Sequence, residues 1–81
     1  MTSIFVKFQF CQVNDIDNLI EKFTSCYKHL KYKQFMLKDE FITIHFESAY
    51  KENYSSVYYK FKTVLKGDRV HNFSLDILEC N

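Results

Sequence analysis

The cysteines and histidines, which are common metal ligands and proton-transfer groups, are few and far apart in this chain. They are Cys11, Cys26, Cys80, His29, His45 and His71. A zinc or thiol redox site is typically formed by close cysteine pairs such as CxxC, or by cysteines and histidines only a few positions apart. Neither spacing occurs here. The pattern therefore favours buried or half-buried free thiols in a reducing compartment, with no metal site and no cofactor.

The sequence patterns typical of nucleophilic catalysis and of phosphate binding are also absent. The serines stand in no G-x-S-x-G turn of the kind that presents a nucleophile in hydrolases. The single glycine, Gly67, cannot form a glycine-rich phosphate loop. His45 and His71 would act as acid, base or ligand only if the fold brought them to Cys11 or Glu47. We expect no enzymatic activity, and a small enzyme or metal carrier is the third hypothesis.

The elements that position these residues begin with a strand at residues 3–10. Its alternate residues on one face are all apolar: Ile4, Val6, Phe8 and Phe10. Phe5, on the opposite face, indicates that the second side of this strand is not fully exposed to water. We therefore place the strand in the middle of a sheet.

A helix is predicted at residues 15–30. Apolar side chains recur there at steps of three and four positions, which gives a helix one buried stripe: Ile16, Leu19, Ile20, Phe23, Tyr27 and Leu30. Asn14 or Asp15 can cap its start. Basic side chains near residue 30 would complement the exposed carbonyls at its end.

A second helical stripe runs from Tyr50 to Leu65. Ser48 is a suitable N-cap for this helix. Gly67 falls where a residue in the left-handed conformation would close it. Tyr59 points away from the stripe, so we expect its ring to be exposed.

Between the two helices lie two extended arms, at residues 32–38 and 41–47, which predict a β-hairpin. In the first arm Phe35 and Leu37 share a face with Lys33. Lysines at both ends of this arm suit an edge strand that is protected against pairing.

An alternating segment at residues 69–80 predicts a fourth strand, so the element order is β-α-β-β-α-β. Elements with one apolar face each bury those faces by forming two layers. The ferredoxin-like arrangement is the simplest solution: an α+β sandwich with a four-stranded antiparallel sheet and two helices on one face. The first and third strands would lie at its centre. We expect residues 1–81 to form a single compact domain.

Composition limits the classes of function. The content of 47% hydrophobic and 19% aromatic residues excludes intrinsic disorder. A net charge of +1 favours neither nucleic acid nor anionic lipid. Because there is no apolar run of membrane-spanning length and no signal pattern, we expect a cytoplasmic protein without membrane contact. The many Phe, Tyr, Ile, Asn and Lys residues indicate an AT-rich genome, such as that of a phage, a large virus or a low-GC bacterium.

The helix-free side of this sheet, termed the open face, is the candidate binding surface. RNA-recognition domains of the same topology stack bases on aromatic side chains of the first and third strands, where Phe5 and His45 would lie. The segment FITIHFE at residues 41–47 has neither the glycine nor the basic lead residue of that family's third strand, so the likeness is one of topology. The candidate partner-binding residues are Phe5, Lys7, Tyr32, Met36, Phe41, His45 and Tyr59.

These patterns and absences favour a small non-catalytic module that binds another protein stoichiometrically. We expect a phage or viral inhibitor, of the anti-CRISPR or toxin-neutralising type, whose partner is a host enzyme or defence complex in the host cytoplasm. A single-stranded RNA-binding domain that uses the open face is the alternative. A homodimer, formed through an edge strand or through the open face, is a further expectation.

Overall fold

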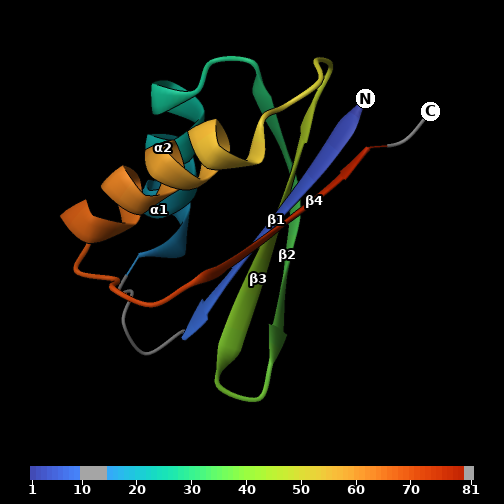
Figure 1. The fold of residues 1–81 in the computed structure, drawn as a ribbon. Coiled ribbons are helices and arrows are strands. Elements are labelled where there is room, and N and C mark those ends of the chain that lie inside the picture. Colours follow the sequence, from blue (N-terminus) through green and yellow to red (C-terminus); the bar gives the residue numbers. More distant parts are fainter. Residues whose placement is uncertain (10–14, 80–81) are drawn as a thin grey trace.

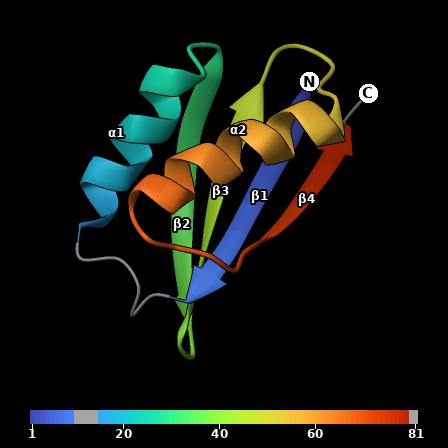
Figure 2. The ribbon, with the colours of Figure 1, turned by 60° about the vertical axis from the view of Figure 1, so that its left-hand side comes forward.

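The computed structural model describes residues 1–9 and 15–79. Its elements are β1 (Thr2–Gln9), α1 (Ile16–Cys26), β2 (Leu30–Lys38), β3 (Phe41–Ser48), α2 (Tyr54–Gly67) and β4 (Ser74–Glu79). The four-stranded sheet is antiparallel, with the strand order β2-β3-β1-β4. Both helices cover one face of it (Figure 1 and Figure 2). The predicted α+β ferredoxin-like arrangement, with the first and third strands at the centre, is confirmed.

The core lies between the sheet and the two helices. Alternate residues of the two central strands point toward the helices and are almost completely buried: Ile4, Val6, Phe8, Ile42, Ile44 and Phe46. Phe23 from α1 and Phe61 from α2 meet above them, with their ring centroids 4.6 Å apart. One contiguous cluster holds all of these side chains. The apolar periods of the sequence, two in strands and 3.6 in helices, therefore identified the buried faces.

Helix α1 starts as predicted and ends early. The Asp15 carboxylate caps it by accepting a hydrogen bond from the Asn18 N–H at 3.0 Å. The helix ends at Cys26 rather than at residue 30, because the chain must turn in time for Leu30 to pair with Ser48 in the sheet. The basic side chains near residue 30 therefore do not lie in the last turn of the helix.

Helix α2 starts later than predicted. Asn53, not Ser48, is its N-cap, and the Asn53 side chain accepts a hydrogen bond from the Ser56 N–H at 3.2 Å. Ser48 is instead the buried last residue of β3. There it pairs with Thr2 and Leu30 of the neighbouring strands, and these sheet contacts prevent it from starting a helix.

Helix α2 ends in a Schellman motif whose left-handed residue is Arg69. The Val70 N–H donates to the Leu65 carbonyl at 2.8 Å, and the Arg69 N–H donates to the Lys66 carbonyl at 3.0 Å. Arg69 has a φ of 64°, whereas Gly67 is the last helical residue and has no positive φ. The prediction that Gly67 closes the helix is therefore wrong. Val70 is buried, and burying it requires the chain to turn at Arg69, two residues after Gly67.

Strand β2 contains a bulge that changes which side chains share a face. The register shifts between Tyr32 and Gln34, so Lys33 is the extra residue. The Lys33 ammonium reaches the Glu47 carboxylate at 3.3 Å, on the open face. Phe35 lies on the helix side of the sheet, opposite Ile44. Lys33 and Phe35 therefore lie on opposite faces of the sheet. An uninterrupted alternation predicts that they share a face, and that prediction is wrong.

Some expectations fall at the limits of the described chain. The predicted strand position of Phe10 and the free thiols of Cys11 and Cys80 lie outside the described residues. Cys26 is a free thiol, but it is exposed rather than buried. Strand β4 is shorter than the predicted segment 69–80, because the end of α2 takes up the beginning of that segment. Neither described helix combines the length and the apolar character needed to cross a membrane.

Candidate functional site

All four strands contribute side chains to the open face. By strand register these are Ser3, Phe5, Lys7, Gln9, Lys31, Gln34, Met36, Lys38, Phe41, Thr43, His45, Glu47, Ser74, Asp76 and Leu78. They alternate with the buried residues because successive strand side chains point to opposite sides of a sheet. Both helices lie on the other side, so no described helix covers this surface (Figure 1 and Figure 2).

Phe5 and His45 form the centre of the open face. They are direct partners across β1 and β3, and their rings stack with centroids 4.4 Å apart and planes 13° from parallel. Because this separation is close to the spacing of adjacent strands, about 4.8 Å, the stacking axis runs across the strands. The rings therefore stand upright on the sheet. Their faces contact each other, and their edges point away from the sheet.

The His45 imidazole has an unsatisfied polar atom. Within residues 1–9 and 15–79, its Nε2 is buried and has no hydrogen-bond partner. A buried polar group left unpaired costs about 1–3 kcal/mol, and such groups are rare enough in folded proteins to require an explanation. A partner that pairs with this nitrogen, or reorients the ring, would remove part of that cost. His45 is therefore a candidate contact residue.

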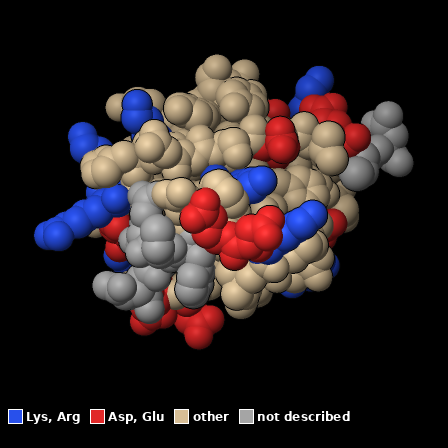
Figure 3. Space-filling model, turned by 90° about the horizontal axis from the view of Figure 1, so that it is seen from below, with Lys and Arg blue, Asp and Glu red and all other residues tan. Residues whose placement is uncertain are grey.

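A groove lies beside this stack, toward the hairpin turn. It is lined by Lys7, Met36, Lys38, Asp39, Phe41 and Thr43. The Lys7 ammonium lies over the Phe41 ring, 4.9 Å from its centroid, in cation–π geometry. Figure 3 views the molecule from this end and shows acidic and basic side chains interspersed on a mainly uncharged surface. The groove therefore offers apolar contacts next to charges of both signs.

The structure brings most of the predicted contact residues together. Phe5, Lys7, Met36, Phe41 and His45 lie on the open face. Tyr32 does not, because the bulge after it reverses the alternation. Its ring packs edge-on against Phe46 on the helix side, with centroids 6.1 Å apart. The prediction that Tyr32 lies beside the open face is therefore wrong. Tyr59 is 72% exposed, but it lies on α2, away from the open face.

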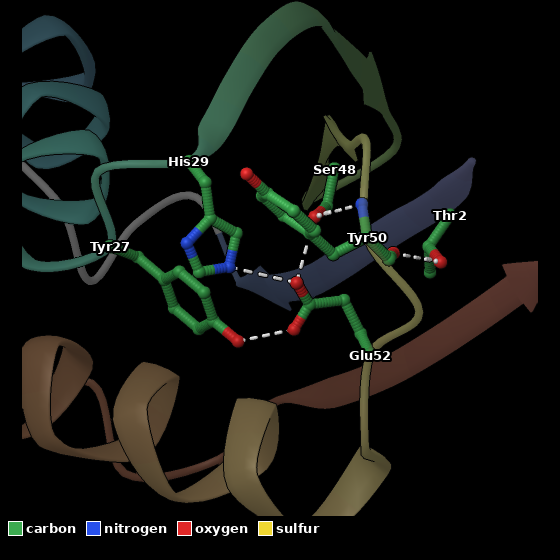
Figure 4. A network of polar contacts seen from close by, with 6 residues as sticks. All are labelled: Thr2, Tyr27, His29, Ser48, Tyr50 and Glu52. Carbon is green, nitrogen blue, oxygen red and sulfur yellow. Dashed lines mark hydrogen bonds and ion pairs between the residues drawn. The ribbon is translucent and has the colours of Figure 1, made fainter.

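A second polar cluster surrounds Glu52, in the loop before α2 (Figure 4). The Glu52 side chain is only 6% exposed. The Ser48 hydroxyl donates to Glu52 Oε1 at 2.7 Å, and His29 Nε2 lies 2.8 Å from the same oxygen. The Tyr27 hydroxyl donates to Oε2. One carboxylate therefore ties the turn after α1 to the end of β3 and to the start of α2.

These contacts determine the charge states within the cluster. Burial alone would raise the pKa of Glu52, but hydrogen bonds from Tyr27, Ser48 and His29 outweigh burial and hold that pKa below its ordinary value. Burial, followed by the hydrogen bond to Glu52 and its negative charge, raises the pKa of Tyr27. At neutral pH Glu52 is therefore ionised, and Tyr27 remains a neutral donor.

The Glu52 cluster orients His29 but has the geometry of a structural tether. The Tyr27 and Tyr50 rings contact the His29 imidazole edge-on, at centroid distances of 4.3 and 5.3 Å. Two of the three groups that contact the carboxylate are hydroxyls, which hold it in place rather than leave it open to a substrate. In the described part of the chain, no three His, Cys, Asp or Glu side chains converge on a point that could hold a metal.

Sequence analysis missed the Glu52 cluster because its members come from separate elements. Tyr27 and Glu52 are 25 positions apart, and nothing in the local pattern links them. A local signal is the four-residue spacing from Ser48 to Glu52, but the sequence indicated only that Ser48 could cap a helix. Neither a protein-family model nor a curated protein matches this chain. What its surfaces can do follows from their own side chains.

Proposed function

We propose that this protein binds another protein stoichiometrically through the open face. The observation that carries the proposal is the upright Phe5–His45 stack, a half-buried aromatic centre on a sheet surface that carries both polar and apolar side chains. Around it lie Met36 and Leu78, which are 59% and 57% exposed. An apolar, aromatic centre with a polar rim is the common composition of protein interfaces.

The orientation of the rings supports a protein partner over RNA. Recognition of single-stranded RNA by such a sheet needs aromatic faces that are open to bases. Phe5 and His45 each have one ring face against the other residue, and the Lys7 ammonium lies over a face of Phe41. Upright ring edges can instead insert between the side chains of a protein partner.

The charges on the open face support the same choice. The basic residues Lys7, Lys31 and Lys38 are accompanied on this face by two acidic residues. Glu47 lies directly opposite Lys31, and Asp76 lies on β4. A phosphate backbone is bound by a continuous basic track, whereas mixed charges give a protein interface its register and specificity.

In its specific form, the proposal is that the protein covers and blocks a surface of a host enzyme or defence complex in the cytoplasm, as an inhibitor of phage or viral origin would. Small size, an AT-biased composition and an aromatic-rich open face support this form. Under this proposal the chain itself carries no catalytic group, and its effect depends on how much of the partner it occupies.

The proposal is tested by capture followed by reconstitution. Immobilised protein is incubated with extract of the host cells, and each enriched protein is purified and titrated calorimetrically. We expect one partner to bind at a ratio of one to one. Phe5→Ala and His45→Ala should each weaken that binding by about 30-fold, as expected for central contacts.

Tyr59→Ala is the matched control, because it removes an exposed aromatic ring from α2 rather than from the open face. It should leave the affinity unchanged. Direct binding that survives both open-face variants would refute the proposal. Capture of a ligand that ribonuclease destroys would refute it in favour of the RNA-binding alternative.

A further inference from the structure

Strand β2 has an unpaired edge with apolar side chains on it. Among residues 1–9 and 15–79 it pairs only with β3, so its outer backbone groups have no partner strand from the described part of the chain. Three consecutive residues there are exposed although they are apolar: Phe35 at 41%, Met36 at 59% and Leu37 at 53%. Met36 lies on the open face, whereas Phe35 and Leu37 lie on the helix side. The helices leave that side uncovered near the hairpin turn, because the β2–β3 hairpin extends past the ends of both helices (Figure 1 and Figure 2). The lysines at the two ends of this strand would protect those ends against pairing, but the residues between Lys33 and Lys38 are uncharged and mostly apolar, and such a stretch of edge favours pairing with another strand.

The regular part of this edge has a centre. Pairing with β3 is continuous from Gln34 to Lys38. The bulge at Lys33 interrupts it on one side, and the hairpin turn at Asp39, where φ is 57°, ends it on the other. The segment available for further pairing therefore runs from Gln34 to Lys38, and Met36 is its midpoint.

We propose that two copies of this chain join by antiparallel pairing of β2 with β2, with the two-fold axis at Met36. This axis pairs the whole regular segment with itself, so none of its residues is left without a partner. In an antiparallel pair, residues directly opposite lie on the same side of the sheet. The two four-stranded sheets would become one continuous sheet, with both open faces on the same side.

The side chains around Met36 are self-complementary in this register. Phe35 lies opposite the second copy's Leu37, and Leu37 lies opposite the second copy's Phe35, so two aromatic–aliphatic pairs form on the helix side. The two Met36 side chains meet on the open face. Gln34 lies opposite the second copy's Lys38, which places a neutral acceptor rather than a like charge against the ammonium.

The charges beyond this segment are also complementary. Lys33 of one copy approaches Asp39 of the other at each end of the paired segment, so opposite charges flank it twice. The side chains of this edge complement one another about Met36, and a strand of unrelated sequence would not in general carry the same complementary side chains. The occupant that fits this edge is therefore a second copy.

The small paired segment determines how stable the dimer is. Five residues from each strand form a smaller contact than the roughly 800 Å² per partner of a standard interface. We therefore expect a reversible dimer whose population rises with protein concentration. The proposal does not rest on the partner-binding function. The two surfaces meet at Met36, but Phe5 and His45 take no part in the dimer contact.

The test compares the two edges of the sheet. Leu37→Lys places a charge opposite Phe35 of the second copy, at a side chain that is already 53% exposed. The matched control is Leu78→Lys, at a 57% exposed leucine on the other edge strand, β4. Sedimentation equilibrium over a wide range of concentration should show a dimer for the natural chain and for Leu78→Lys. Leu37→Lys should raise the dissociation constant at least tenfold.

Hydrogen exchange on the natural chain keeps the test decisive if Leu37→Lys does not fold. Amides between residues 34 and 38 should become more protected as concentration rises, whereas those of β4 should not. A monomer at every concentration, or a dimer that only Leu78→Lys dissociates, would overturn the proposal. So would protection of residues 34–38 that appears only when a different protein is bound.

Discussion

The Tyr27 hydroxyl donates a hydrogen bond to the Glu52 carboxylate, and this contact joins the end of α1 to the beginning of α2. The Lys60 ammonium of α2 lies over the Tyr27 ring, 4.1 Å from its centroid. Tyr27 is 5% exposed. The turn that follows α1 and the loop that precedes α2 are therefore held together by one buried pair.

Replacing Glu52 should destabilise the fold. Glu52→Gln removes the charge and turns an amide N–H₂ group toward donors, so it should lower the free energy of unfolding by about 2 kcal/mol, in the range for hydrogen bonds to charged groups. Tyr27→Phe keeps the ring and should cost about 1 kcal/mol. Urea denaturation measures both. Glu40→Gln, in the exposed hairpin turn, is the control and should change little. Equal stability of Glu52→Gln and Glu40→Gln would show that the cluster does not tie the loops together.

The same carboxylate predicts a pH dependence with a definite sign. The pKa of Glu52 is lower in the folded protein than its ordinary value of 4.5. Its contribution to stability is therefore fully present above the unfolded pKa and is lost as pH falls through the folded pKa. The difference in thermal midpoint between the natural chain and Glu52→Gln should be constant from neutral pH to about pH 5 and should shrink below it. A difference that grows on acidification would contradict this assignment.

The contiguous core predicts large losses from single truncations. Phe8 is 2% and Phe61 is 1% exposed. Phe8→Ala and Phe61→Ala should each cost about 3–5 kcal/mol, a large part of the 5–15 kcal/mol typical of a small domain. Calorimetric thermal unfolding measures the loss. Tyr59→Ala, at an exposed ring, should stay within about 0.5 kcal/mol of the natural chain. An unchanged thermal midpoint in either core variant would show that the layers are wrong.

The end of α2 predicts two stabilising substitutions. Arg69 has a φ of 64°, which costs a residue with a Cβ atom about 1 kcal/mol, so Arg69→Gly should raise the thermal midpoint. Gly67 is helical, and an added Cβ there meets nothing within 4 Å. Gly67→Ala should therefore stabilise the helix by about 0.5–1 kcal/mol. If Arg69→Gly lowers the midpoint, the Schellman geometry at this position is not the one described.

Salt dependence separates the two classes of partner. Binding to a protein through the open face should weaken only modestly with salt, because the net charge is +1 and the face carries both signs. Binding to RNA would instead weaken steeply as counterions are released. Fluorescence anisotropy with labelled single-stranded RNA should show no saturable binding. Micromolar or tighter binding that is weakened both by salt and by Phe5→Ala would decide for RNA.

The sequence by itself determined the fold and the location of the core. Ile4, Val6 and Phe8 repeat with a period of two, and Phe23 and Phe61 belong to stripes with a helical period. These periods identify a buried face without knowledge of any contact, because water is excluded from whichever side carries the apolar groups. The open face followed as the complement of the buried one, so Phe5 and His45 could be placed on it in advance.

The tertiary structure decided whatever depends on a contact between distant segments. The bulge at Lys33 puts Tyr32 on the helix side, because the inserted residue places Tyr32 and Gln34 on opposite faces of the sheet. Glu52 gathers donors from the turn after α1 and from the end of β3, and only their convergence holds its pKa below the ordinary value. Phe35 and Leu37 are exposed because the hairpin extends past the helices. The local sequence pattern shows which face of a helix or strand is buried. How far along its length that face is covered, and which groups its polar atoms bond to, depends on the other elements packed around it.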